Sequence, residues 1–347
     1  MNRLARLPCA TYPRPDELLS SWLTRLAHSH LIKTYTFGRV LFPGVNIWNT
    51  DLDRRAPEGI LQTLAIRTGT PLEQVQQTVL RRYEGRLYLR HNENGASNWI
   101  LPLGIYHRTR RHYGLLFCPR CLRKDGAVPY FRTHWRLAIA QVCTSCGVYL
   151  HERCPDCERP VTFFRVELGR KSAMPDTPIS HCFHCGLDLA TVRVKVAPTH
   201  IQTAQAELER ILLEGWNAHV FFPHQYFNVL HQLVKTLVST RPASKILQRA
   251  VDAQTGWSPL EENKSVRTYR TPVELLPLRV RAGVIRQAQW LLTDWPHRLL
   301  ETVRQYKIAS TPFLYAMPEI PFWYHSVIME KLYVSNGNRY FSGFWRN

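Results

Sequence analysis

Four C-x-x-C pairs lie close together in the middle of this chain, and they constrain its folding more than any other feature. They account for eight of its nine cysteines. The pairs are Cys118 and Cys121, Cys143 and Cys146, Cys154 and Cys157, and Cys182 and Cys185. Two such pairs supply the four thiolates of one closed, tetrahedral zinc site, so the sequence predicts two structural zinc ions.

The separation of the pairs predicts which two pairs bind the same zinc ion. The first two pairs lie 21 residues apart and the last two 24 residues apart, as in two successive treble-clef or ribbon-like modules. We therefore expect the first two pairs at one ion and the last two at the other. An interleaved cross-brace is the alternative pairing, and an iron–sulfur cluster is the alternative centre. The neighbouring histidines are expected to be spectators, namely His134, His151, His181 and His184.

A disulfide framework would require secretion, and the N-terminus does not resemble a secretion signal. Residues 1–20 contain prolines and acidic side chains where a continuous apolar stretch would be needed. No segment is apolar over the length of a membrane span. We expect a cytoplasmic protein whose thiols stay reduced and available to metal. The remaining cysteine, Cys9, is predicted to be a small core residue.

The charge of the chain points to a polyanionic partner. Its 45 Lys and Arg residues against 26 Asp and Glu residues give a formal charge of +19. Such a field attracts nucleic acid, although a generally basic surface without a specific partner is the alternative. The length of 347 residues and the 45% hydrophobic content indicate a folded protein with several modules.

Helical patterns precede the cysteines. Residues 13–28 predict an entry segment and an amphipathic helix with Leu18, Trp22 and Leu26 on its apolar face. A second helix is expected over residues 57–68, stopped by Gly69, and a third over residues 70–82, with a capping box at its start. These two helices predict a helix-turn-helix, with an ordinary helical hairpin as the alternative.

Helical patterns also follow the cysteines. Helices are expected around residues 208–212, 230–238 and 278–292, with another beginning at Pro296 and forming a second helix-turn-helix candidate. Residues 242–270 are expected to form a linker or mobile loop. The aromatic tail, residues 312–347, must pack on the body of the protein or on a partner.

Several arginines are candidates for contacts to nucleic acid. Arg81 and Arg82 end the third predicted helix, and the strand-like connection over residues 87–117 carries a basic cluster. Two further arginines lie on the outer face of the helix over residues 278–292. The complete set is Arg81, Arg82, Arg108, Arg110, Arg111, Arg279 and Arg286.

The fold class that follows is mainly α, with small zinc-bound α+β modules. We expect an N-terminal helical domain over residues 1–112, tandem zinc modules over residues 113–195, and a C-terminal helical domain over residues 196–347.

Several motifs in this order resemble the TniQ/TnsD family of target selectors of bacterial cut-and-paste transposons. They are P-x-P-D-E-L-L-S-S-W-L-T-R-L-A from Pro13, L-F-C-P-R-C-L from Leu116, Pro129-Tyr130 ahead of Trp135, C-P-D-C ending at Cys157, C-x-x-C-G from Cys182, and L-L-x-D-W-P ending at Pro296. The family often has histidine where this chain has Cys146, but both residues bind zinc.

The resemblance implies an adaptor that joins a target-recognition element to the AAA+ regulator TnsC, which engages the transposase. Some members read attachment-site DNA directly, and others dock as a dimer on an RNA-guided type I CRISPR Cascade effector. The intermediate length of this chain favours the Cascade-docked role. Direct, sequence-specific DNA binding is the alternative, as is a role like that of members in heavy-metal resistance transposons, which use neither arrangement.

Two other classes of protein compete with this interpretation. An enzyme would need a phosphate-binding loop, an H-E-x-x-H motif or convergent carboxylates, and we expect no enzymatic activity because the first two are absent from the sequence. The acidic residues Asp51, Asp53, Asp188 and Asp294 are expected to be caps or surface charges. A helix-turn-helix transcription regulator would instead bind one duplex sequence tightly by itself.

Overall fold

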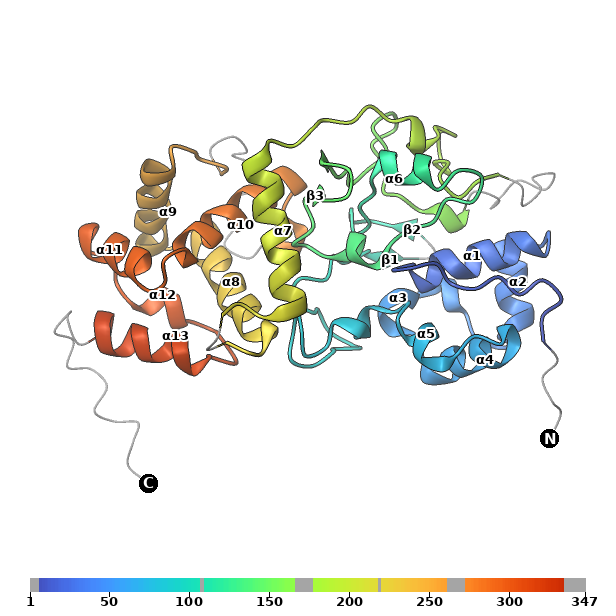
Figure 1. Cartoon of the computed structure of the whole chain (residues 1–347), viewed down its shortest axis with the longest axis horizontal. Helices are drawn as coiled ribbons and strands as arrows, with labels where there is room; N and C mark the ends of the chain where they lie inside the picture. The colour runs from blue at the N-terminus through green and yellow to red at the C-terminus, as the bar shows by residue number, and fades with distance from the viewer. Residues whose placement is uncertain (1–5, 107–108, 166–176, 218–219, 261–271, 334–347) are drawn as a thin grey trace, which may run out of the picture. The chain divides into compact units, whose positions relative to one another are not determined.

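The computed structural model describes residues 6–106, 109–165, 177–217, 220–260 and 272–333. The chain divides into two compact units (Figure 1). Unit 1 takes in residues 1–84 and 90–207, and unit 2 takes in residues 85–89 and 208–347. Most of the regular structure is helical, in agreement with the predicted fold class. The finer division into three domains stays a prediction.

Unit 1 combines short helices with two small hairpins. Its helices are α1 (Leu19–Ser29), α2 (Thr34–Leu41), α3 (Leu52–Arg55), α4 (Glu58–Thr68), α5 (Leu72–Gln76), α6 (Pro119–Lys124) and the first part of α7 (Thr199–Glu214). Strand β1 (Ile105–Tyr106) pairs antiparallel with β2 (Thr109–Arg110), and β3 (Val142–Cys143) pairs antiparallel with β4 (Val148–Tyr149). Single 3-10 turns link them at Ile47–Asn49, Leu80–Tyr83, Thr133–Arg136, Phe163–Arg165 and Leu189–Thr191.

Helix α1 is a buried helix of unit 1, and its apolar stripe was predicted correctly. Its apolar residues Leu19, Trp22 and Leu26 are fully buried. Ser20, Ser21 and other polar residues of the helix are buried as well, so α1 is covered on all sides. A helix in this position needs internal partners for its polar side chains, because a buried hydroxyl without a hydrogen bond is costly.

The α4–α5 hairpin was predicted correctly at its turn and incorrectly in its second helix. Gly69 ends α4 in the left-handed conformation, with φ of 72°. Helix α5 ends at Gln76, however, and no capping-box bond opens it. The chain leaves the helix because the Thr78 carbonyl accepts a hydrogen bond from the Leu19 amide at 2.9 Å. Arg81 and Arg82 therefore lie on the 3-10 turn Leu80–Tyr83.

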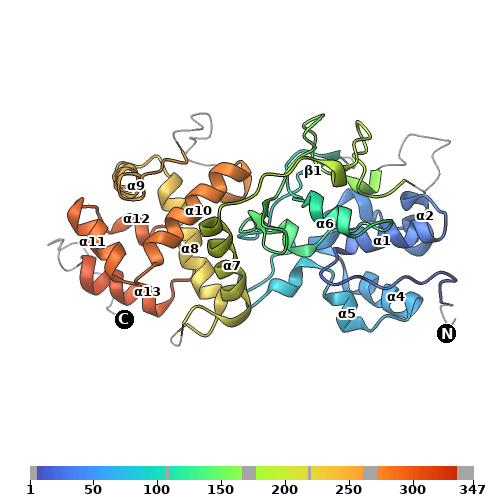
Figure 2. The ribbon, with the colours of Figure 1, turned by 45° about the horizontal axis from the view of Figure 1, so that its top comes forward.

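Unit 2 is a helical assembly that continues from α7. It contains α8 (Pro223–Val238), α9 (Pro242–Thr255), α10 (Leu278–Leu292), α11 (His297–Gln305), α12 (Thr311–Leu314) and α13 (Phe322–Val327), with a 3-10 turn at Val273–Leu275 and a π-helical end at Ile328–Tyr333. Helices α8 and α10 pack side by side (Figures 1 and 2). Their predicted apolar residues Leu233, Val234 and Ile285 are fully buried. The helix-turn-helix assignment of α10 and α11 stays a prediction.

The predicted linker over residues 242–270 is wrong for its first half, which is helix α9. Pro242 occupies the first turn of this helix, where proline costs no hydrogen bond. Gly256 closes the helix with φ of 68°. Pro242 and Gly256 therefore mark the two ends of a helix inside the segment that was expected to be a linker. Residues 261–271 lie outside the described part of the chain.

The aromatic tail packs in part on unit 2. Phe313 and Tyr324 are fully buried, whereas Phe322 is 83% exposed. Four further aromatic residues of the tail, Tyr340, Phe341, Phe344 and Trp345, lie outside the described residues. Within the described ranges, every helix is too short or too polar to traverse a lipid bilayer.

Candidate metal centres and the polar network beside them

The first two C-x-x-C pairs come together in one cluster. Cys118 precedes α6 and Cys121 lies in its first turn, while Cys143 ends β3 and Cys146 lies in the turn before β4. The Sγ atom of Cys121 is 3.5 Å from that of Cys143 and 3.6 Å from that of Cys146. Three of the four cysteines are buried and Cys146 is half-buried.

The last two pairs form a second cluster with the same geometry and greater exposure. The Sγ atoms of Cys154 and Cys185 are 3.5 Å apart, and those of Cys157 and Cys182 are 3.6 Å apart. Cys157 is half-buried and Cys185 is exposed. The structure thus groups the pairs sequentially and not as an interleaved brace.

A tight turn presents each pair of sulfurs. In every pair, the carbonyl of the first cysteine accepts a hydrogen bond from the amide that follows the second cysteine. These bonds run from Leu122 to Cys118 (3.1 Å), Gly147 to Cys143 (2.8 Å), Glu158 to Cys154 (2.9 Å) and Gly186 to Cys182 (2.9 Å). Gly147 and Gly186 have φ of 66° and 83°, a conformation that glycine adopts without strain. The local sequence therefore builds each half-site.

The sulfur geometry fits zinc. A tetrahedral ion with Zn–S bonds of about 2.3 Å holds its sulfurs about 3.8 Å apart. All ligand atoms in each cluster lie within 4.8 Å of one another, and all eight cysteines are free of disulfides. A zinc ion bound in each cluster would be coordinated by four thiolates, which leaves no position for an activated water.

Hydrogen bonds among the thiols of the first cluster shift their pKa values in opposite directions. Hydrogen bonds from Cys121 and Cys143 lower the pKa of Cys118 to about 4. The bonds to Cys118 and Cys121 raise the pKa of Cys143, because a second thiolate would lie beside the first. In the second cluster, burial raises the pKa of Cys157 to about 12. A divalent cation removes this restriction, since it stabilises all four thiolates together.

The histidines near the clusters and the ninth cysteine, Cys9, lie outside both groups of four cysteines. Among the described residues, the four-ligand groups contain only cysteines, so the predicted spectator histidines stay outside them. His151 stacks on Phe117 with ring centroids 5.3 Å apart, and burial lowers its pKa. The prediction that Cys9 is a core residue is wrong, because this residue is exposed and its amide donates to His30 Nε2 at 3.4 Å.

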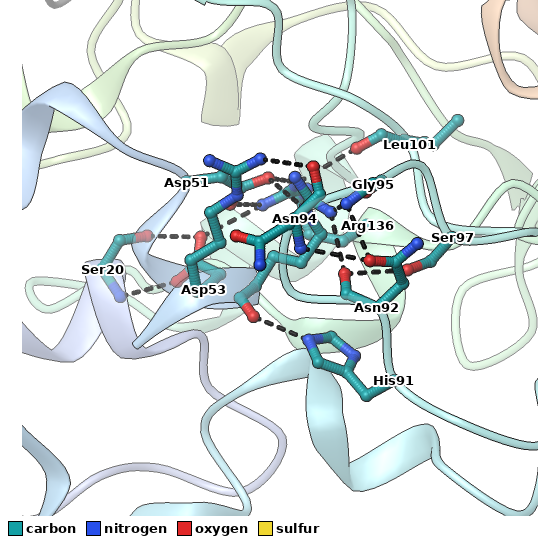
Figure 3. Close-up of polar contacts among 12 residues, drawn as sticks. Ser20, Asp51, Asp53, His91, Asn92, Asn94, Gly95, Ser97, Leu101 and Arg136 are labelled. Carbon is teal, nitrogen blue, oxygen red and sulfur yellow. Dashed lines mark hydrogen bonds and ion pairs between the residues drawn. The ribbon is translucent and has the colours of Figure 1, made fainter. Parts of the chain in front are cut away.

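A buried ionic network lies in unit 1 around Arg136, whose side chain is fully buried (Figure 3). Its guanidinium donates to Asp51 at 2.6 and 3.0 Å and to Asp53 at 3.2 Å. Asp53 in turn accepts hydrogen bonds from the Ser20 amide at 2.8 Å and hydroxyl at 2.9 Å. The network joins α1, α3 and the turn Thr133–Arg136, and it supplies the partner that Ser20 requires.

This network was not predicted. Asp51 does occupy the N-cap position of α3, but its side chain makes no capping bond there, and both carboxylates are buried and are not surface charges. Burial by itself would raise the pKa of both carboxyls. The charge of Arg136 and its hydrogen bonds bring the pKa of Asp51 below its usual value, whereas burial prevails for Asp53. Asp188 is a cap as expected, since its side chain accepts from the Ala190 amide at 3.0 Å.

A second polar cluster holds the start of α1 to the zinc-bearing part of unit 1. Asp16 contacts the Thr133 hydroxyl and the His134 ring, and it accepts from Arg82 at 3.0 Å. Burial alone would raise the pKa of Asp16, but the hydrogen bond and charge of His134 lower it below its usual value. The tertiary fold therefore orients the side chain of Arg82.

The candidate nucleic-acid contacts in unit 1 lie in different environments. Arg81 is exposed and pairs with Glu93. Arg110 lies against the Phe163 and Phe164 rings and donates to the Val161 carbonyl at 2.7 Å. Burial and then the charge of Arg136 lower the pKa of Arg110 to about 10.

The other candidate arginines lie in the vicinity of the second hairpin strand or in unit 2. Arg111 lies over the Tyr106 ring at 4.1 Å, and Arg108 lies outside the described residues. In unit 2, Arg279 is exposed and Arg286 stacks over Trp257 at 3.9 Å. Contact with nucleic acid stays a prediction for the whole set.

Comparison with known proteins matches part of unit 1 to one family. Residues 8–150 match the TniQ family model. This region contains α1 to α6, the Arg136 network and the first cysteine cluster, whereas the second cluster follows it. No curated protein matches the chain.

Proposed function

The chain carries a TniQ family domain over residues 8–150, and on that premise we propose that it is a target-selection adaptor in DNA transposition. The TniQ domain carries this proposal, because TniQ proteins are non-catalytic accessory proteins that take part in choosing the transposition target. The finer proposal is that the chain connects a target-recognition complex to the AAA+ regulator TnsC, and through it to the transposase.

The chemistry of unit 1 supports an adaptor and not a nuclease. A nuclease requires carboxylates that converge on a divalent cation. Asp51 and Asp53 do converge, but on the guanidinium of Arg136, which occupies the position that a cation would need. The cysteine clusters suit structural zinc, which would hold the loops between the pairs in place.

We further propose that recognition of the target is delegated to an RNA-guided Cascade effector on which the protein docks. The short α5 supports this choice. A helix that reads the major groove presents several side chains along its length, whereas α5 ends after five residues. The α4–α5 hairpin is therefore better suited to contact a protein.

Direct reading of DNA is the second candidate, and the β1–β2 hairpin favours it. Tyr106 is 53% exposed and carries Arg111 over its ring at 4.1 Å. An exposed ring beside a guanidinium is suited to nucleic acid, because it offers both stacking and a charge for phosphate.

Affinity purification of the tagged full-length protein from its host, followed by sequencing of bound nucleic acid and identification of bound proteins, tests these alternatives. Recovery of TnsC with guide RNA and Cascade subunits is expected. Recovery of one genomic DNA site without guide RNA would contradict the RNA-guided proposal. The variant Arg111→Ala is the matched control, since it should reduce DNA recovery only if the hairpin reads DNA.

A further inference from the structure

Unit 1 contains a cavity of about 290 Å³ beside the α4–α5 hairpin. The end of α3, the start of α4, the end of α5 and the turn Leu80–Tyr83 supply its walls. Its volume is close to the lower limit of small-ligand sites, so it can hold one or two amino-acid side chains. Nothing in the proposed adaptor function assigns a role to it.

Three arginines line this cavity, and hydrogen bonds within the protein orient two of them, Arg54 and Arg82. Arg54 donates to the Asn92 carbonyl at 3.0 Å and to the Gly95 carbonyl. Arg82 donates to Asp16 and to the Gln77 carbonyl, each at 3.0 Å. Guanidiniums that are already oriented lose little conformational freedom when they bind a carboxylate.

The contact between Arg54 and Asp51 is long. Asp51 Oδ2 lies 3.9 Å from Arg54 Nε, at the limit of an ion pair. The same carboxylate is held by Arg136 at 2.6 Å. Arg54 adds a guanidinium to the wall of the cavity.

The third arginine already carries a carboxylate at the surface. Arg81 contacts Glu93, and the two side chains are 45% and 56% exposed. An exposed pair of this kind contributes little to stability, because water and salt screen it. A carboxylate from another molecule can therefore replace Glu93 on Arg81 at small cost.

The remaining walls are apolar or carry amides. Leu61 and Val79 are buried beneath the cavity and give it an apolar floor. Gln76 donates to Glu58 at 3.3 Å, and both line the cavity together with Gln77. Amides beside an apolar floor suit a peptide, since they bond to its backbone while a side chain covers the floor.

The acidic groups around the cavity argue against nucleic acid as its ligand. Asp16 and Glu93 pair with two of the lining arginines, and Glu58 is itself part of the wall. A nucleic-acid backbone would bring several phosphates to these carboxylates, and the repulsion would oppose binding. A peptide with one carboxylate needs only one arginine to exchange its partner.

We propose that this cavity binds an acidic-apolar peptide segment of a protein partner. The segment places its carboxylate on Arg81, in place of Glu93, and an adjacent apolar side chain on Leu61 and Val79. The α4–α5 hairpin, which was predicted to be a helix-turn-helix, would then recognise a peptide.

Titration of the full-length protein with a fluorescent capped peptide of sequence Ser-Leu-Asp-Leu-Ser tests the proposal. Its counterpart with asparagine in place of aspartate should bind at least about tenfold more weakly, because it lacks the charge-assisted bonds. Arg81→Ala should cause a similar loss, and Arg90→Ala, a change at an exposed arginine outside the cavity wall, should leave affinity unchanged.

Glu93→Gln provides a test that does not depend on removing an arginine. It should raise affinity by about two- to fivefold, since it removes the internal competitor for Arg81. Equal binding of the two peptides, or unchanged binding by Arg81→Ala and Glu93→Gln, would overturn the proposal. So would displacement of the peptide by an equal concentration of a single-stranded oligonucleotide, which would identify a nucleic-acid site.

Discussion

At the scale of single residues, Arg136 holds together the buried ionic network of the TniQ domain. It donates hydrogen bonds to two carboxylates that come from a segment more than 80 residues earlier in the chain. A buried ion pair is a weak source of net stability, but the loss of one partner is costly because the other charge stays buried. The contribution of Arg136 to the free energy of unfolding therefore depends on the presence of Asp51 and Asp53.

Arg136→Met is expected to reduce the free energy of unfolding by about 3–5 kcal/mol, since it leaves two buried carboxylates without their guanidinium. Urea denaturation followed by circular dichroism measures this loss as a lower midpoint. The triple variant with Asp51→Asn and Asp53→Asn should recover part of the stability. Arg90→Met, at an exposed position, is the control, and a similar loss in both single variants would contradict this account.

At the scale of elements, α4 shows how one backbone position ends a helix. Gly59 lies in the first turn of α4, and an added Cβ would meet no atom within 4 Å. Gly69 follows the helix with φ of 72°, and an added Cβ would approach the Arg6 guanidinium at 3.0 Å. Gly59 therefore has a helical conformation that any residue can adopt, whereas Gly69 has a left-handed conformation that favours glycine.

Alanine at these two positions should have opposite effects. Gly59→Ala is expected to stabilise the protein by about 0.5–1 kcal/mol, because alanine loses less backbone entropy in a helix. Gly69→Ala is expected to destabilise it by about 1–2 kcal/mol, since alanine is strained in the left-handed region. Thermal denaturation of the two variants measures both changes, and a shift of the same sign would show that the helix end is set elsewhere.

At the scale of the whole molecule, the two cysteine clusters differ in their exposure to solvent. The first cluster is mostly buried within the TniQ domain, whereas the second has an exposed Cys185 and a half-buried Cys157. A chelator reaches an exposed site sooner, and removal of structural zinc unfolds the segment that it holds.

Treatment of the zinc-loaded protein with a chromogenic chelator should release metal in two phases. Cys185→Ser should abolish the fast phase and preserve the slow one, whereas Cys121→Ser should remove the slow phase and unfold the TniQ domain. Cys9→Ser, a change at the exposed cysteine outside both clusters, should affect neither phase. Release in a single phase would show that the clusters open together.

The sequence by itself determined the features that depend on neighbouring residues. The four C-x-x-C turns, the apolar stripe of α1 and the glycine at the end of α4 each require only a few consecutive residues. Local sterics and backbone hydrogen bonds decide such features, and a local pattern is enough to predict them.

Only the tertiary structure decided the rest. Helix α5 ends early because the Leu19 amide bonds to the Thr78 carbonyl, and Arg136 pairs with Asp51 and Asp53 because the fold brings three distant segments together. The arginines Arg81 and Arg54 likewise meet in one cavity through packing. Burial and electrostatics act between residues that are far apart in the chain, so no local pattern in the sequence could have revealed these contacts.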